Sequence, residues 1–170
     1  MKTRHSQGRW LFLAATFIAA SALGGLIKIP SPVGSIALDS APGYFLAAYV
    51  HPVLGAVVGG IGHLASAASA GFPLGYVHIW VAMQVFVWCL SFGYIARAFD
   101  TQWALIPAIL VAALLNGVVG PLMLGLLKLV NMGLAVAVIP VLTVASIANL
   151  LIAAAAVRLL SLSAARRAAR

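Results

Sequence analysis

Long apolar runs separated by short polar, proline or glycine breaks make up most of this chain. There are six such runs, at about residues 10–27, 43–50, 53–70, 76–96, 103–127 and 134–160. A helix needs about 20 apolar residues to cross a bilayer, and only the second run is much shorter than that. The pattern predicts an all-α membrane protein, a bundle of six transmembrane helices whose second span is short and borrows residues from the preceding loop.

The breaks differ in length and composition. Residues 28–42 and 71–75 are rich in proline, glycine and serine, whereas His51-Pro52 and residues 99–102 form short connections. Because successive connections alternate between the two sides of a membrane, the two long loops share one face with residues 128–133. Binding residues concentrate on structured loops held by a rigid scaffold. We therefore expect a ligand site that opens on the long-loop face.

The composition supports a membrane location and narrows the chemistry. The 170 residues are 64% hydrophobic and 7% charged, whereas a soluble domain carries about 25% charged residues. Cys89 is the only cysteine, which excludes a disulfide framework and a cysteine-rich metal site. We expect a single membrane domain over residues 1–170, with a basic N-terminus over 1–9, the bundle over 10–160 and a basic tail over 161–170.

The charged residues indicate the orientation. The chain has ten Lys and Arg residues and only two acids, Asp39 and Asp100. With both termini inside, Lys28 and Lys128 lie outside and the other cations inside, as the positive-inside rule requires. The inner cations are Lys2, Arg4, Arg9, Arg97, Arg158, Arg166, Arg167 and Arg170. This predicts a multi-pass plasma-membrane protein with cytoplasmic termini and no nucleic-acid partner, since the cations form no recognition motif.

Common catalytic and energising motifs are absent from the sequence. It contains neither a Gly-x-x-x-x-Gly-Lys-Ser/Thr phosphate loop nor a His-Glu-x-x-His zinc motif. Asp39 and Asp100 fall on opposite faces, so they cannot work as a paired acid and base. No Asp or Glu lies within a predicted span, where proton-driven transporters usually carry one. We expect a binding protein without enzymatic activity, cofactor or metal, which draws energy from a partner.

Asp39 is the only acid on the predicted outer face. A carboxylate there can accept hydrogen bonds from ligand hydroxyl or ring N–H groups. Ser40 adds a hydroxyl beside it, and Tyr44 adds a ring on which a ligand can stack. The alternatives for Asp39 are a salt bridge to Lys28 or Lys128, or a cap on the second helix.

Polar side chains inside spans are costly and are often functional. His63 lies on the third span, where Gly55 and Gly59 precede it at intervals of four and permit close helix contact. His78 lies near the outer end of the fourth span. Both histidines are candidate ligand-binding residues, and the alternative for His63 is a structural hydrogen bond between helices.

Aromatic rings and amides supply the remaining candidates. Trp80 and Gln84 are four residues apart, so they share a helix face and can offer a stacking ring beside an amide. Tyr76 offers a second ring, although Trp80 is also typical of the aromatic belt at a membrane interface. Asn116 and Asn131 can bind ligand hydroxyls. Their alternatives are an interhelical hydrogen bond and a loop turn.

Together these features resemble the substrate-binding S components of energy-coupling factor (ECF) vitamin transporters. The general likeness covers nearly the whole chain: a basic N-terminus, a first helix with Ala15-x-x-x-Ala19, about six spans and outward loops. More locally, residues 27–44 (IKIPSPVGSIALDSAPGY), 62–64 (GHL) and 71–74 (GFPL), with His78, resemble the CblT-type subgroup. That subgroup is associated with α-ribazole, a dimethylbenzimidazole nucleoside used to build the lower ligand of cobalamin.

The resemblance implies an S-component-like bundle with an outward pocket formed by the first, third and fifth loops and the adjoining helix ends. It also implies that Ala15 and Ala19 face a membrane-embedded T component, whose two ATPase partners supply energy. Transport in this family is thought to proceed by toppling of the S component in the bilayer. A vitamin-like small molecule would thus be captured outside and delivered inside.

The expected ligand is α-ribazole, and its chemistry suits the candidate residues. Its base can stack on one of three rings, Tyr44, Tyr76 or Trp80. Its ribose offers hydroxyls to Asp39, Asn116 or Asn131. The alternatives are an S component for another vitamin or a queuosine-type base, a polytopic membrane enzyme using His63 and a neighbouring serine, and a structural membrane protein.

Overall fold

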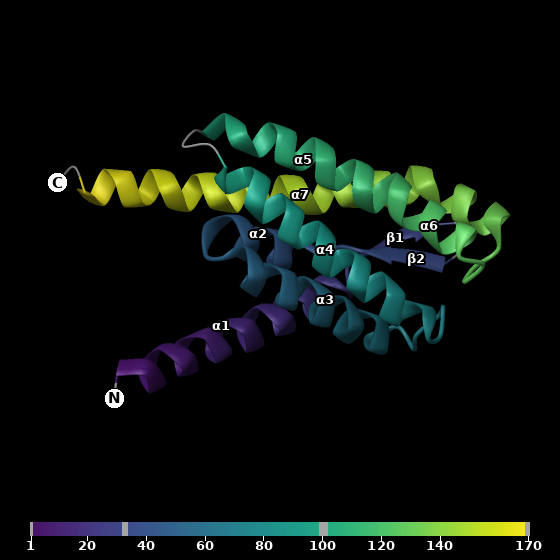
Figure 1. Cartoon of the computed structure of the whole chain (residues 1–170), viewed down its shortest axis with the longest axis horizontal. Coiled ribbons are helices and arrows are strands. Elements are labelled where there is room, and N and C mark those ends of the chain that lie inside the picture. The colour runs from purple at the N-terminus through teal and green to yellow at the C-terminus, as the bar shows by residue number, and fades with distance from the viewer. Residues whose placement is uncertain (1, 32–33, 99–101, 169–170) are drawn as a thin grey trace.

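The computed structural model describes residues 2–31, 34–98 and 102–168, and nearly all of them are helical (Figure 1). Asp100 and Arg170, which the charge pattern assigns to the inner face, lie outside the described residues. The elements in chain order are α1 (Lys2–Gly24), β1 (Lys28–Ser31), β2 (Gly34–Ala37), α2 (Ala41–Tyr49), α3 (Pro52–Ser69), α4 (Val77–Arg97), the 3-10 turn η1 (Gln102–Ala104), α5 (Leu105–Leu114), the π-helical segment η2 (Leu115–Val119), α6 (Gly120–Leu126) and α7 (Met132–Ala168).

Four helices are long and apolar enough to cross a membrane, which makes this a membrane-embedded protein. They are α3, α4, the continuous helix Leu105–Leu126 formed by α5, η2 and α6, and α7. The predicted count of six is not confirmed for the described residues. The apolar part of α1, Gly8–Gly24, is shorter than these spans, and α2 has nine residues.

The short second helix ends where the sequence predicts a tight turn. A residue before proline is driven out of the helical region, and His51, before Pro52, has φ −161° and ψ 132°. The His51 ring then caps α3, since its Nδ1 accepts a hydrogen bond from the Val53 N–H at 3.2 Å. At the same end, the Arg97 guanidinium donates to the carbonyl oxygens of Ala48 and Val50. α2 is therefore stopped locally at its C-terminal end.

The loop predicted over residues 28–42 contains an antiparallel two-stranded hairpin, which the all-α prediction missed. β1 pairs with β2 from Lys28 opposite Ala37 to Ser31 opposite Gly34. The pairing is continued by the Leu38 N–H, which donates to Ile27 O at 3.2 Å. Both strands lie against α7. The hairpin delivers Asp39 and Ser40 to the start of α2.

Small residues on α3 bring the neighbouring helices into backbone contact, as the glycine spacing predicted. A Cβ added at Gly59 would lie 2.5 Å from the sulfur of Cys89, and one added at Gly43 would lie 2.7 Å from Gly59 Cα. Such distances are too short for a real side chain, so only glycine allows this approach. Next to this contact, the buried rings of Tyr44 and Phe92 pack edge to face at 5.2 Å.

The chain termini and the long loops lie at opposite ends of the bundle. Both termini lie at one end in Figure 1, whereas the hairpin and the α6–α7 connection lie at the opposite end. The α3–α4 connection also lies at that opposite end. The long loops thus share one end, as alternation across a membrane predicted.

Candidate ligand-binding site

A cavity of about 210 Å³ lies at the loop end of the bundle. One water occupies about 30 Å³ in the liquid, so the space suits a small organic molecule. Its wall is mostly aliphatic, as in small-molecule sites generally, and among the described residues that line it there is no Lys or Arg. The polar side chains that line it are Asp39, Ser40, His63, Ser66, His78, Gln84, Asn116, Ser146 and Asn149.

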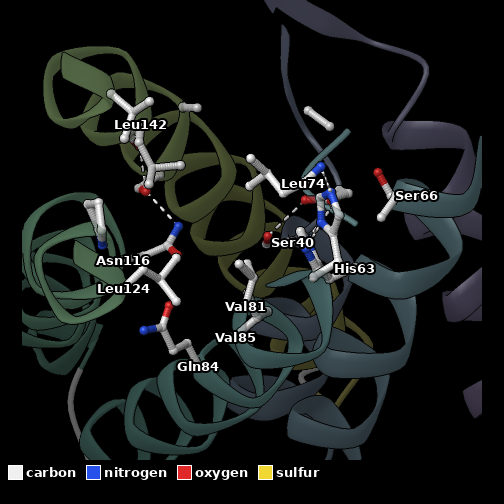
Figure 2. Close-up of a pocket in the computed structure, with 18 of the residues that line it drawn as sticks. Ser40, His63, Ser66, Leu74, Val81, Gln84, Val85, Asn116, Leu124 and Leu142 are labelled. Atoms are coloured by element: carbon white, nitrogen blue, oxygen red, sulfur yellow. Dashed lines mark hydrogen bonds and ion pairs between the residues drawn. The ribbon is translucent and has the colours of Figure 1, made fainter. Parts of the chain in front are cut away.

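These polar groups form two separate walls. Figure 2 shows Ser40 and His63 on one side of the cavity, with Gln84 and Asn116 on the other. We call the first set, with Asp39 and His78, the histidine wall. We call Gln84 and Asn116, with Ser146 behind them, the amide wall.

The histidine wall is a continuous chain of hydrogen bonds. Asp39 Oδ2 lies 3.3 Å from His63 Nδ1, and His63 Nε2 lies 3.2 Å from His78 Nδ1. At the far end, His78 Nε2 accepts from the Leu74 N–H at 3.3 Å. At the near end, the Ser40 hydroxyl donates to Asp39 Oδ1 at 3.0 Å. The chain joins the start of α2 to α3, α4 and the loop before α4.

The partners at the ends of this chain determine which nitrogens carry protons. The Leu74 N–H can only donate, so His78 Nε2 accepts, and in the neutral ring His78 Nδ1 carries the proton. His78 Nδ1 then donates to His63 Nε2, which leaves the His63 proton on Nδ1, facing Asp39. Two neutral imidazoles and one carboxylate thus satisfy every ring nitrogen. A further proton on either ring would break one of these bonds.

The amide wall is built on α4, η2 and α7. Gln84 Nε2 donates to Gly120 O at 3.2 Å, and Asn116 Nδ2 donates to Ser146 Oγ at 2.7 Å. The Ser146 hydroxyl in turn donates to Leu142 O at 2.7 Å. Asn116 lies within the π-helical segment, and such wide turns often occur at functional sites.

The π-helical segment has two local causes. Pro121, two residues beyond its end, has no N–H to continue the helical ladder. A Cβ added at Gly117 would lie 2.8 Å from Thr143 Cα, so the segment also touches the backbone of α7. The Gly120 N–H bonds back to Leu115 O, five residues earlier, which widens the turn that carries Asn116.

Asn149 fixes the position of the histidine wall from across the bundle. Its Oδ1 accepts from the backbone N–H of Ser40 at 3.0 Å and of Ala41 at 2.8 Å. Its Nδ2 donates to Ala145 O at 2.9 Å. These N–H groups open α2 and have no partner within the helix. A side chain of α7 thus caps α2 and holds Asp39 beside the cavity.

Six of the ten predicted ligand-binding residues line the cavity, namely Asp39, Ser40, His63, His78, Gln84 and Asn116. Within the described part of the chain, Asp39 pairs with His63 and Ser40 and not with Lys128. The stripe of Gly55 and Gly59 does place His63 in an interhelical contact, which was the alternative considered for it.

The other four predicted residues lie outside the cavity. Tyr44 is fully buried in the core, and Tyr76 and Trp80 are 69% and 42% exposed. Asn131 accepts from the Gly133 N–H at 2.7 Å and caps the start of α7, which is the loop turn considered for it. Trp80 and Gln84 are a full helical turn apart, but only Gln84 reaches the cavity, because four residues overshoot one turn by about 40°.

Sequence reasoning did not select three polar residues of the lining, Ser66, Ser146 and Asn149. Asn149 is a polar residue within an apolar run, which was a signal of its importance. Its partners are 108 and 109 residues away, however, so its role could not be inferred from local pattern.

The predicted partner-facing residues lie at the surface. Ala15 and Ala19 are exposed on α1. α1 packs on α3 and α2 at the edge of the bundle (Figure 1).

The histidine wall is not arranged as a metal centre. Within residues 2–31, 34–98 and 102–168, no group of three His, Cys, Asp or Glu side chains could hold a metal ion. Asp39, His63 and His78 point along a line of hydrogen bonds and do not converge on one point.

The chain matches no protein-family model, no curated protein and no solved structure. Its likeness to S components therefore rests on the sequence motifs given above.

Proposed function

We propose that this protein is the substrate-binding S component of an ECF-type transporter, which captures a vitamin-like small molecule outside the cell. The observation that carries the proposal is the position of the cavity. Its lining includes residues of the hairpin and of the α3–α4 and α6–α7 connections, such as Ala37, Pro73 and Val130. Figure 1 shows these segments at the end of the bundle opposite both termini, whereas Arg158, Arg166 and Arg167 lie in the C-terminal part of α7. The positive-inside rule places such cations in the cytoplasm, so the cavity would open outward.

The lining indicates the charge of the ligand. Asp39 is an acid, and the described residues that line the cavity include no Lys or Arg to balance an anion. An anionic ligand would have to lose its hydration without a compensating charge. We therefore propose a neutral ligand, with α-ribazole as the best candidate. Another vitamin or a queuosine-type base would fit the same charge argument.

The expectation that the base of the ligand stacks on an aromatic ring of the protein needs revision. None of Tyr44, Tyr76 and Trp80 reaches the cavity. The flat ring of the ligand would instead lie between aliphatic side chains, such as Val81, Val85 and Leu124 in Figure 2. Such contacts still stabilise a ring by removing apolar surface from water.

A membrane enzyme receives less support from the same geometry. Asp39 does orient the His63 ring, as a catalytic carboxylate would. The other nitrogen of that ring faces His78 at 3.2 Å, in the place where a nucleophilic serine would be needed.

We further propose that the exposed face of α1 docks on a T component, which two ATPase subunits serve. Small residues such as Ala15 and Ala19 allow close helix contact in a bilayer. The exposed face continues with large apolar side chains, including Leu11 and Phe12, each 71% exposed. Toppling of this component would then carry the cavity to the cytoplasmic side.

Two experiments test these proposals separately. Isothermal titration of the purified chain against a vitamin panel, including α-ribazole and dimethylbenzimidazole, should find one ligand that binds. If no panel member binds, the assignment as an S component is wrong. The double variant Ala15→Trp, Ala19→Trp should abolish uptake while leaving ligand binding intact, whereas Ala137→Trp, at an exposed alanine of α7, should not. Normal uptake by the double variant would exclude α1 as the docking face.

A further inference from the structure

The amides of the cavity are held by groups that can only accept hydrogen bonds, and this determines which end of each amide faces the ligand. Gly120 O is a carbonyl, so Gln84 must present its NH₂ to it. The single proton of Ser146 is given to Leu142 O, so Ser146 Oγ can only accept from Asn116. In both amides the NH₂ group is bound to protein, and the carbonyl oxygen has no hydrogen-bond donor among the described residues.

The two amide side chains are neighbours on the amide wall. A Cβ added at Gly120 would lie 3.3 Å from Gln84 Oε1, so this oxygen sits beside Gly120. Gly120 and Asn116 are four residues apart on one continuous helix, and such residues are neighbours on a helix surface. Figure 2 shows Gln84 and Asn116 next to each other on the wall opposite His63.

The polar groups of the opposite wall are already paired within the protein. Each ring nitrogen of His63 and His78 is already paired, and both carboxylate oxygens of Asp39 accept from protein donors. A ligand could reach the ring nitrogens only by disrupting the chain, whereas each Asp39 oxygen can still accept a second hydrogen bond. The amide wall differs, because its two carbonyl oxygens have no protein donor among the described residues, and leaving a buried acceptor unpaired is unfavourable.

We infer that Gln84 and Asn116 form an acceptor subsite that binds two neighbouring hydrogen-bond donors of the ligand, such as the vicinal hydroxyls of a sugar. This inference rests on the proposed role of the cavity as the substrate site. It orients the ligand, with its donor-bearing end against η2 and its apolar ring among the aliphatic side chains of the lining. It also explains selectivity, since a group with lone pairs alone would meet two carbonyl oxygens and be repelled.

The test uses the purified full chain and two probes, α-ribazole, which carries ribose hydroxyls, and 5,6-dimethylbenzimidazole, the base without the sugar. Gln84→Met and Asn116→Leu each remove one carbonyl acceptor while keeping a similar volume. Each is expected to weaken α-ribazole binding about tenfold and to leave binding of the base unchanged. Met83→Leu, at a 57% exposed position of the same helix α4, is the matched control.

Ser146→Ala is a further variant that distinguishes loss of a carbonyl acceptor from misfolding. It keeps both carbonyl groups but releases the Asn116 amide, so it should weaken α-ribazole less than Asn116→Leu does. Equal losses for α-ribazole and the base, or no loss for α-ribazole, would overturn the acceptor subsite while leaving the transporter proposal intact. If neither probe binds the unaltered chain, the α-ribazole assignment fails and the subsite inference falls with it.

Discussion

The two polar walls of the cavity contain similar numbers of hydrogen-bonding groups but differ in what they leave for a ligand. On the histidine wall, every donor is matched to an acceptor, from Leu74 through His78 and His63 to Asp39. On the amide wall, Gln84 and Asn116 bind through their NH₂ groups, and within the described part of the chain their carbonyl oxygens remain without a donor. A polar side chain that lines a cavity is thus not necessarily a ligand contact. Whether it can bind a ligand depends on which of its donor and acceptor atoms are already paired within the protein.

The largest effect is expected from replacing Asp39 by leucine. This substitution leaves the Ser40 hydroxyl and the His63 Nδ1–H without an acceptor in a buried place. We expect the free energy of unfolding to fall by about 3 kcal/mol, measured as a lower Tm in detergent. Asp39→Asn should cost about 1 kcal/mol or less, because its oxygen can accept from His63 and its amide can donate to Ser40.

This pair of variants discriminates between a structural and a ligand-binding role for Asp39. Both roles predict a defect for Asp39→Leu. If Asp39→Asn kept full stability but lost ligand binding, the carboxylate would contact the ligand directly and the division into two walls would be wrong.

A smaller loss of stability is expected for Asn149→Leu, which removes the cap of α2. Two buried backbone N–H groups, those of Ser40 and Ala41, lose their acceptor. We expect a loss of about 2 kcal/mol in unfolding free energy, measured by thermal unfolding in detergent. Ile147→Leu, at a 39% exposed position of α7, should have no effect. A loss no larger than that of the control would show that α2 does not depend on α7.

Gly120→Ala perturbs the amide wall without removing any of its groups. The new Cβ would lie 3.3 Å from Gln84 Oε1 and would push this oxygen away from its position. We expect a normal Tm and a ligand affinity lowered by less than about tenfold, measured by titration. Gly8→Ala is the matched control, because a Cβ there meets nothing within 4 Å. An unchanged affinity would place the ligand away from Gln84.

The smallest effect is expected for Tyr44→Phe. The Tyr44 hydroxyl is buried without a hydrogen-bond partner among the described residues, so its removal should change stability by no more than about 1 kcal/mol, in the stabilising direction. Ligand affinity should stay the same, because the ring packs on Phe92 in the core and not in the cavity. A lower affinity would restore Tyr44 to the ligand site.

The sequence predicted most of the helices because their boundaries depend on local properties. Apolar runs and breakers placed the six helical segments to within a few residues, apart from the basic extensions of α1 and α7. The predicted six spans are not confirmed, because among the described residues only four helices are long and apolar enough to cross a membrane, and α2 has nine residues. The hairpin was missed because its strands have only four residues each.

The candidate site was only partly predictable. The rarity of polar residues in apolar runs was enough to select His63, Gln84 and Asn116, since such residues are costly in a membrane. The presence of an aromatic ring did not identify residues of the cavity, because Tyr76 and Trp80 are exposed at the surface. One helix presents side chains in every direction, and its neighbours decide which of them faces a cavity.

The sequence by itself determined that this is a helical membrane protein, where its helices begin and end, and which few polar residues had to be explained. Only the tertiary structure decided which of them face the cavity and which of their atoms are free. The physical reason is the range of the interactions. Hydropathy and proline act over a few residues, whereas the Asn149 cap on α2 joins groups 108 and 109 residues apart. Whether a carboxylate or an amide oxygen is left for a ligand depends on such distant partners.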